Sequence, residues 1–167
     1  MYLLKLIDSI NNIFMKIAAV LLGLTTLLIL LEILMWNTME KSLLITDEYS
    51  AYGLAAMVFL GAGFTLRNDG HIKISLFVNL FNRKIANIIT FISVLSATVF
   101  SSILVYYLFI MVSETYSYQS TSGTISATKL WIPQTIMLAG AIGFLLQIFA
   151  ETIRAFLNIN NRENEGA

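Results

Sequence analysis

The chain has 167 residues, of which 57% are hydrophobic and only 12% are charged. An ordinary soluble domain is about a quarter charged, so the composition indicates a protein that lives in the lipid bilayer. Ten basic and ten acidic side chains balance, which excludes the one-sign charge field that attracts nucleic acid. The absence of cysteine excludes disulfides, iron–sulfur clusters and a cysteine nucleophile. A single histidine excludes a haem held between two histidines of this chain, and we expect no cofactor.

Four apolar stretches are long enough to cross a bilayer, which takes about 20 helical residues. They cover approximately 14–37, 48–66, 85–112 and 131–155. Their continuous apolar character lacks the alternation typical of a membrane barrel. The sequence therefore predicts an all-α membrane protein, with four transmembrane helices forming a single integral membrane domain over residues 1–167.

Two shorter segments are amphipathic, approximately 2–12 and 71–83. In the first, Leu6 and Ile10 lie on a helical face opposite Lys5 and Asp8. The second follows Asn-Asp-Gly, a sequence that favours a tight turn with positive φ at Gly70. We expect both segments to form separate helices that lie flat in the cytoplasmic headgroup layer and contact membrane lipids.

The distribution of lysine and arginine predicts the orientation of the spans. Eight of the ten basic residues flank the two ends of the chain or lie in the second loop, whereas the first and third loops have only Lys41 and Lys129. Because basic loops stay in the cytoplasm, both termini are expected on the cytoplasmic side.

Glu32 is a charge inside a predicted span. An acid within the membrane is costly and suggests proton coupling or pairing with a partner chain. It lies about one helical turn from Trp36, roughly 6 Å below the expected outer interface. At that depth it could instead reach the headgroups or bond to a neighbouring helix, and both interpretations stay open.

Small residues recur on one face of the second span and predict close helix packing. This face consists of Glu48, Ala51, Tyr52, Ala55, Phe59, Ala62 and Gly63. Small side chains let helices approach closely in lipid. The stripe could serve the internal four-helix bundle or dock a second protein.

Glu48 and Arg67 cap opposite ends of this span, about 28 Å apart by helical rise, so they cannot pair with each other. We expect each to contact water, lipid headgroups or a different partner. His71 has no second soft ligand close in sequence, so a metal site is not expected. The sequence also lacks a Ser-His-Asp set, paired catalytic carboxylates and a phosphate-binding glycine loop, which argues against an enzyme.

The runs 46–52 (TDEYSAY) and 59–74 (FLGAGFTLRNDGHIKI) resemble the signature of the small membrane subunit of tripartite ATP-independent periplasmic (TRAP) transporters, the DctQ-like family. The signature positions are occupied here by Glu48, Gly61, Arg67, Gly70 and His71. Trp36 stands where that family often has an arginine near the end of the first span, so a role for that arginine is not carried over.

The resemblance implies a subunit of a bacterial uptake system in the inner membrane. Its partners would be a periplasmic substrate-binding protein and a large TRAP membrane subunit, which imports an organic acid such as a dicarboxylate or sialic acid with an ion gradient. The small subunit would be a scaffold for the stationary part of the large one.

Two other functions are alternatives for a membrane chain of this kind. A compact four-helix proton-coupled drug antiporter would use Glu32, but the acid is shallow and the second loop is long and basic. A membrane anchor of a redox complex would need haem ligands that this chain lacks.

Overall fold

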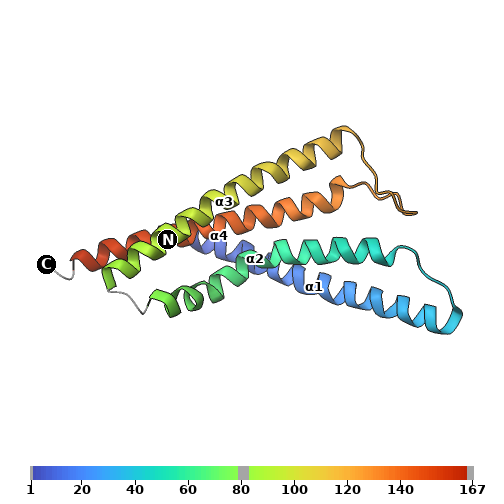
Figure 1. Ribbon diagram of the computed structural model, residues 1–167, viewed down its shortest axis with the longest axis horizontal. Helices are drawn as coiled ribbons and strands as arrows, with labels where there is room; N and C mark the ends of the chain where they lie inside the picture. The colour runs from blue at the N-terminus through green and yellow to red at the C-terminus, as the bar shows by residue number, and fades with distance from the viewer. Residues whose placement is uncertain (1, 79–82, 165–167) are drawn as a thin grey trace.

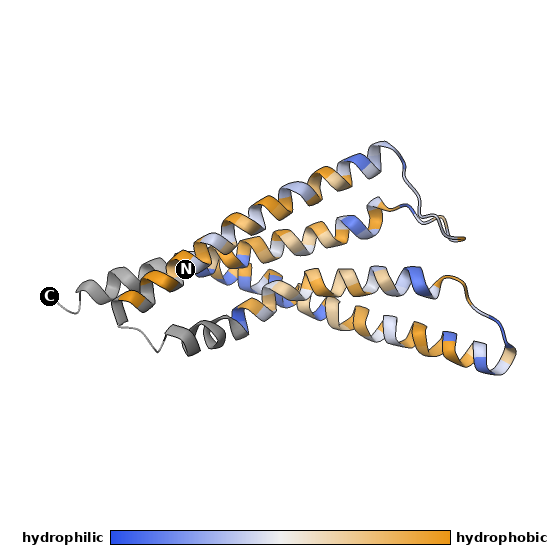
Figure 2. Cartoon of the chain, in the orientation of Figure 1, coloured by the Kyte–Doolittle hydropathy of each residue, from blue (hydrophilic) through white to orange (hydrophobic). Residues whose placement is uncertain are grey.

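The computed structural model describes residues 2–78 and 83–164, which form a bundle of four helices (Figure 1). They are α1 (Tyr2–Met39), α2 (Thr46–Val78), α3 (Arg83–Ser117) and α4 (Trp131–Asn164). All four are long and apolar enough to cross a membrane, over Leu4–Met39, Thr46–Asn68, Phe91–Ser117 and Trp131–Arg154. Apolar residues run along every helix (Figure 2). The predicted all-α fold with four membrane helices is confirmed.

The helix α4 lies at the centre of the packing. It contacts α2 along one side and α3 along the other, while α1 packs mainly on α2 and more briefly on α4. The helix α3 lies at the edge of the bundle, with few contacts to any helix except α4. The α1–α2 loop and the α3–α4 loop lie at the same end of the bundle. Towards this end the pair α1–α2 diverges from the pair α3–α4 (Figure 1).

The N-terminal segment 2–12 is not a separate interfacial helix, because it forms the first turns of α1. No proline or glycine occurs before Gly23 to break the helix. Two of its polar side chains face the bundle: Asn11 is buried and Asp8 bonds to α4. Lys5 and Ser9 are exposed, as are Leu6 and Ile13. The predicted helical conformation is correct, but the segment is continuous with the first membrane helix and two of its polar side chains pack on other helices.

The predicted turn at Gly70 is wrong, because α2 continues as a helix to Val78. One glycine inside a helix costs only about 1 kcal/mol, and the next proline in the sequence is Pro133. Residues 71–78 therefore belong to α2 and are not a separate helix. The remainder of the predicted second-loop helix includes 79–82, which lie outside the described residues.

Glycines set the close approach of the central helices. A Cβ atom built on Gly140 of α4 would lie 2.6 Å from the backbone carbonyl carbon of Phe59 and 2.7 Å from the backbone nitrogen of Leu60 in α2. Side-chain rearrangement cannot relieve a clash with backbone. Gly140 therefore fixes the α2–α4 distance, as small residues do in membrane helix pairs.

Candidate functional site

Asp8 of α1 joins three helices near the end of the bundle that holds both termini. The Nη2 atom of Arg154, in α4, donates to the two carboxylate oxygens of Asp8 at 3.2 and 3.0 Å. Arg67, in α2, lies 3.5 Å from the same carboxylate. Arg154 also pairs with Glu151 on its own helix. Two arginines and two acids thus form a locally neutral cluster.

A buried amide pair continues this cluster into the bundle. The Nδ2 atom of Asn11 donates to Oε1 of Gln147 at 2.9 Å, and the two side chains are 1% and 0% exposed. Gln147 in turn donates to Asp8 at 3.4 Å and Glu151 at 3.3 Å. Because burying a polar group without a hydrogen bond is costly, these bonds favour the observed packing of α1 on α4.

Gly63 of α2 makes room for Asn11. A Cβ atom at Gly63 would clash with the Oδ1 atom of Asn11, and this oxygen has no hydrogen-bond partner among the described residues. The glycine thus allows α2 to lie directly over the amide. This member of the small-residue stripe serves the internal bundle.

Sequence reasoning did not single out Asp8, Asn11, Gln147 or Arg154. The available signal was the spacing of Gln147, Glu151 and Arg154, which places three polar groups on one face of an apolar helix. Their partners on α1 are more than 130 residues away in sequence, so the pattern alone could not pair them.

Glu48, in the first turn of α2, holds the loop between α3 and α4. Thr124 and Ser126 of that loop donate to its Oε2 atom, and the Tyr52 hydroxyl donates to Oε1 at 2.8 Å. The loop is itself closed by an antiparallel bridge between Thr121 and Lys129. We name residues 118–130 the outer hairpin. Glu48 and Arg67 lie in separate clusters and do not pair.

Glu32 holds the loop between α1 and α2. Its carboxylate accepts hydrogen bonds from the Ser42 hydroxyl at 2.6 Å, the Leu43 backbone N–H at 2.9 Å and the Thr46 hydroxyl at 3.0 Å. Thr46 is the first residue of α2. Of the interpretations left open by the sequence, bonding to the neighbouring helix and its loop matches this geometry.

The remaining residues of the small-residue stripe lie in different environments. Ala55, Ala62 and Tyr52 are half-buried, whereas Ala51 is exposed. Among the signature residues, Gly61 has open space where a Cβ atom would lie. Gly70 and His71 belong to the part of α2 whose side chains lie outside the described residues.

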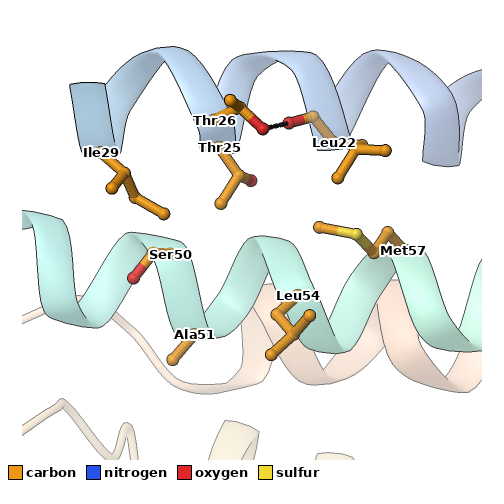
Figure 3. Close-up of a pocket in the computed structure, with 8 residues that line it drawn as sticks. All are labelled: Leu22, Thr25, Thr26, Ile29, Ser50, Ala51, Leu54 and Met57. Carbon is orange, nitrogen blue, oxygen red and sulfur yellow. Dashed lines mark hydrogen bonds between the residues drawn. The ribbon is translucent and has the colours of Figure 1, made fainter. Parts of the chain in front are cut away.

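A groove of about 430 Å³ lies between α1 and α2 on the outer surface (Figure 3). It is lined by Leu22, Thr25, Thr26, Ile29, Ser50, Ala51, Leu54 and Met57. The hydroxyls of Thr26 and Ser50 donate to backbone carbonyls of their own helices. No titratable side chain lines the groove, so it offers no charge to bind an organic acid.

The family model that matches the chain is the DctQ component of the tripartite ATP-independent periplasmic transporters, over residues 25–158. No curated protein and no solved structure matches the chain.

Proposed function

Since the chain belongs to the DctQ component family of TRAP transporters, we propose that it is the scaffold that anchors the large subunit of such a transporter. The transporter as a whole takes up an organic acid, which a periplasmic binding protein delivers and the ion-coupled large subunit carries. This chain braces the stationary part of the large subunit and does not itself move substrate.

The observation that carries the scaffold proposal is that three acidic side chains of the bundle bond to other parts of the same chain. The acids Asp8, Glu32 and Glu48 each bond to residues of other helices or loops. A carrier needs polar groups that face a substrate pathway. Here these three acids join the elements of the bundle to one another, which is what a rigid brace requires.

A proton-coupled antiporter is not favoured. Its coupling acid would be Glu32, and that carboxylate accepts three hydrogen bonds from the α1–α2 loop and the start of α2. It does not line the groove between α1 and α2. These contacts give the carboxylate a local structural role at the α1–α2 loop.

The four apolar helices and the family make this a multi-pass membrane protein. We place it in the bacterial inner membrane with both termini in the cytoplasm, because eight of the ten basic residues flank the termini or lie in the second loop. In this orientation the Asp8 cluster is at the cytoplasmic end, and Glu48 with the outer hairpin is at the periplasmic end.

The test is affinity purification of the tagged chain in mild detergent from cells that also express the large subunit. A scaffold co-purifies with the large subunit in a fixed ratio, with or without substrate. A tagged unrelated four-helix membrane protein is the control for detergent carry-over. Recovery of the chain without the large subunit would exclude the scaffold function.

A further inference from the structure

Two neighbouring tyrosines on α3 expose most of their surface on the outside of the bundle. The side chains of Tyr106 and Tyr107 are 61% and 64% exposed, and their rings meet edge to face with centroids 5.6 Å apart. Ile103, one turn before them, and Phe100, two turns before them, are exposed as well. We name these four residues the outer face of α3.

The two tyrosines lie well inside the membrane span of α3. Within the span Phe91–Ser117, Tyr106 is about 22 Å from the first residue and about 16 Å from the last by helical rise. Side chains on a helix lean towards its N-terminus, so the hydroxyls are directed away from the nearer end. Tyrosine in membrane proteins is normally concentrated at the interfaces, where its hydroxyl meets water or headgroups.

Neither hydroxyl has a hydrogen-bond partner among the described residues, whereas several shorter hydroxyl side chains of α3 do. Ser96, Thr98 and Ser102 all donate to carbonyls four residues earlier on their own helix. A phenol is held too far from the backbone to do this. Acyl chains have no acceptor, so lipid contact would leave both hydroxyls unpaired at a cost.

The position of α3 leaves room for a partner on this side. The helix packs almost entirely on α4 and forms an edge of the bundle (Figure 1). An occupant must lie within the membrane and present hydrogen-bond acceptors there. A subunit that carries a charged substrate has polar groups at this depth.

We propose that the outer face of α3 binds the large membrane subunit of the transporter, and that Tyr106 and Tyr107 donate hydrogen bonds to acceptors on it. This assignment rests on the proposed function, which supplies the partner. In this assignment the α1–α2 groove, at the other edge of the bundle, is left to lipid.

The first test removes only the two hydroxyls. The double variant Tyr106→Phe, Tyr107→Phe keeps both rings and is expected to fold as the parent does. Its affinity for the purified large subunit in nanodiscs should fall roughly tenfold, about threefold for each hydroxyl. Tyr116→Phe is the matched control, because Tyr116 is also exposed on α3 but lies near the end of the helix. Equal affinity of the double variant and the parent would overturn the inference.

The second test locates the partner directly. A photoreactive benzoylphenylalanine at position 107 should crosslink to the large subunit, and the same group at Leu54 in the groove should not. Crosslinking at 107 only to lipid or only to a second copy of this chain would refute the assignment. If the parent chain does not bind the large subunit at all, the proposed function fails; if it binds but only position 54 crosslinks, this inference alone fails.

Discussion

Asp8 shows how one side chain can determine the packing of three helices. It accepts two hydrogen bonds from Arg154 and lies beside Arg67. Replacement by asparagine removes the charge that both arginines share. A hydrogen bond to a charged group contributes about 1.5–3 kcal/mol to stability. Removing the charge of Asp8 should therefore cost more stability than removing that of an exposed acid without a partner.

We therefore expect Asp8→Asn to lower the stability of the isolated chain by about 1–3 kcal/mol, measured as a decrease in Tm in detergent. Asp47→Asn is the matched control, because Asp47 is exposed and its carboxylate has no partner among the described residues. Equal Tm values for the two variants would show that the Asp8 cluster does not stabilise the packing of the three helices.

Arg67 gives a prediction at the level of the complex. Because its guanidinium contacts Asp8 only at 3.5 Å and is 35% exposed, it has further N–H donors for lipid phosphate or an acid of the large subunit. Arg67→Ala should reduce uptake in cells that express all three components by lowering the amount of assembled complex. A normal amount of complex with changed substrate preference would contradict the scaffold function.

Glu48 gives a prediction about the outer hairpin. Glu48→Ala removes the acceptor of Thr124, Ser126 and Tyr52, so the backbone of residues 118–130 should exchange its amide hydrogens faster. Hydrogen exchange followed by mass spectrometry measures this directly. Glu114→Ala, an exposed acid on α3, should leave exchange in the hairpin unchanged. Unaltered exchange in Glu48→Ala would mean that the bridge Thr121–Lys129 suffices.

At the scale of the helices, the sequence predicts which segments are helical better than it predicts where each helix begins, breaks or ends. The four apolar runs predict four helices, since length and hydropathy are local properties. The break at Gly70 was wrong because turn residues set a preference of about 1 kcal/mol, which neighbouring helical residues can outweigh. The separate N-terminal helix was wrong because its amphipathic pattern is the same whether the polar side meets headgroups or Gln147.

The two glycines of α2 and α4 give a matched pair of substitutions. Gly140→Ala places a methyl group against the backbone of Phe59 and Leu60 and should destabilise the isolated chain by about 1–3 kcal/mol. Gly61→Ala places the same group in open space and should be neutral or stabilising by up to about 1 kcal/mol. Thermal unfolding of both variants measures the difference. Equal effects would show that α2 and α4 can separate without loss.

At the scale of the whole molecule, the candidate site was only partly predictable. Glu48 and Arg67 were recognised because they stand at the ends of an apolar span. Their partners Thr124 and Asp8 are 76 residues and 59 residues away, so local spacing contains no information about them. The proposed scaffold function came from the family signature, and the bonds of the three acids within the bundle support it.

The orientation of the molecule can be tested because the chain has no cysteine. A cysteine at Gly123 in the outer hairpin, where a side chain meets open space, should react with a membrane-impermeant maleimide added from the periplasmic side. A cysteine at Asn161 should react only after the membrane is opened. The reverse pattern would place both termini in the periplasm and refute the assignment from the basic residues.

The most direct test of the scaffold function is uptake by proteoliposomes under an imposed ion gradient. Vesicles with this chain, the large subunit and the substrate-loaded binding protein should accumulate the organic acid, and vesicles with this chain alone should accumulate none. Glu32→Gln should leave uptake by the full system near that of the parent if the complex assembles. Proton-driven transport by the chain alone, abolished by Glu32→Gln, would show that the chain is itself a carrier.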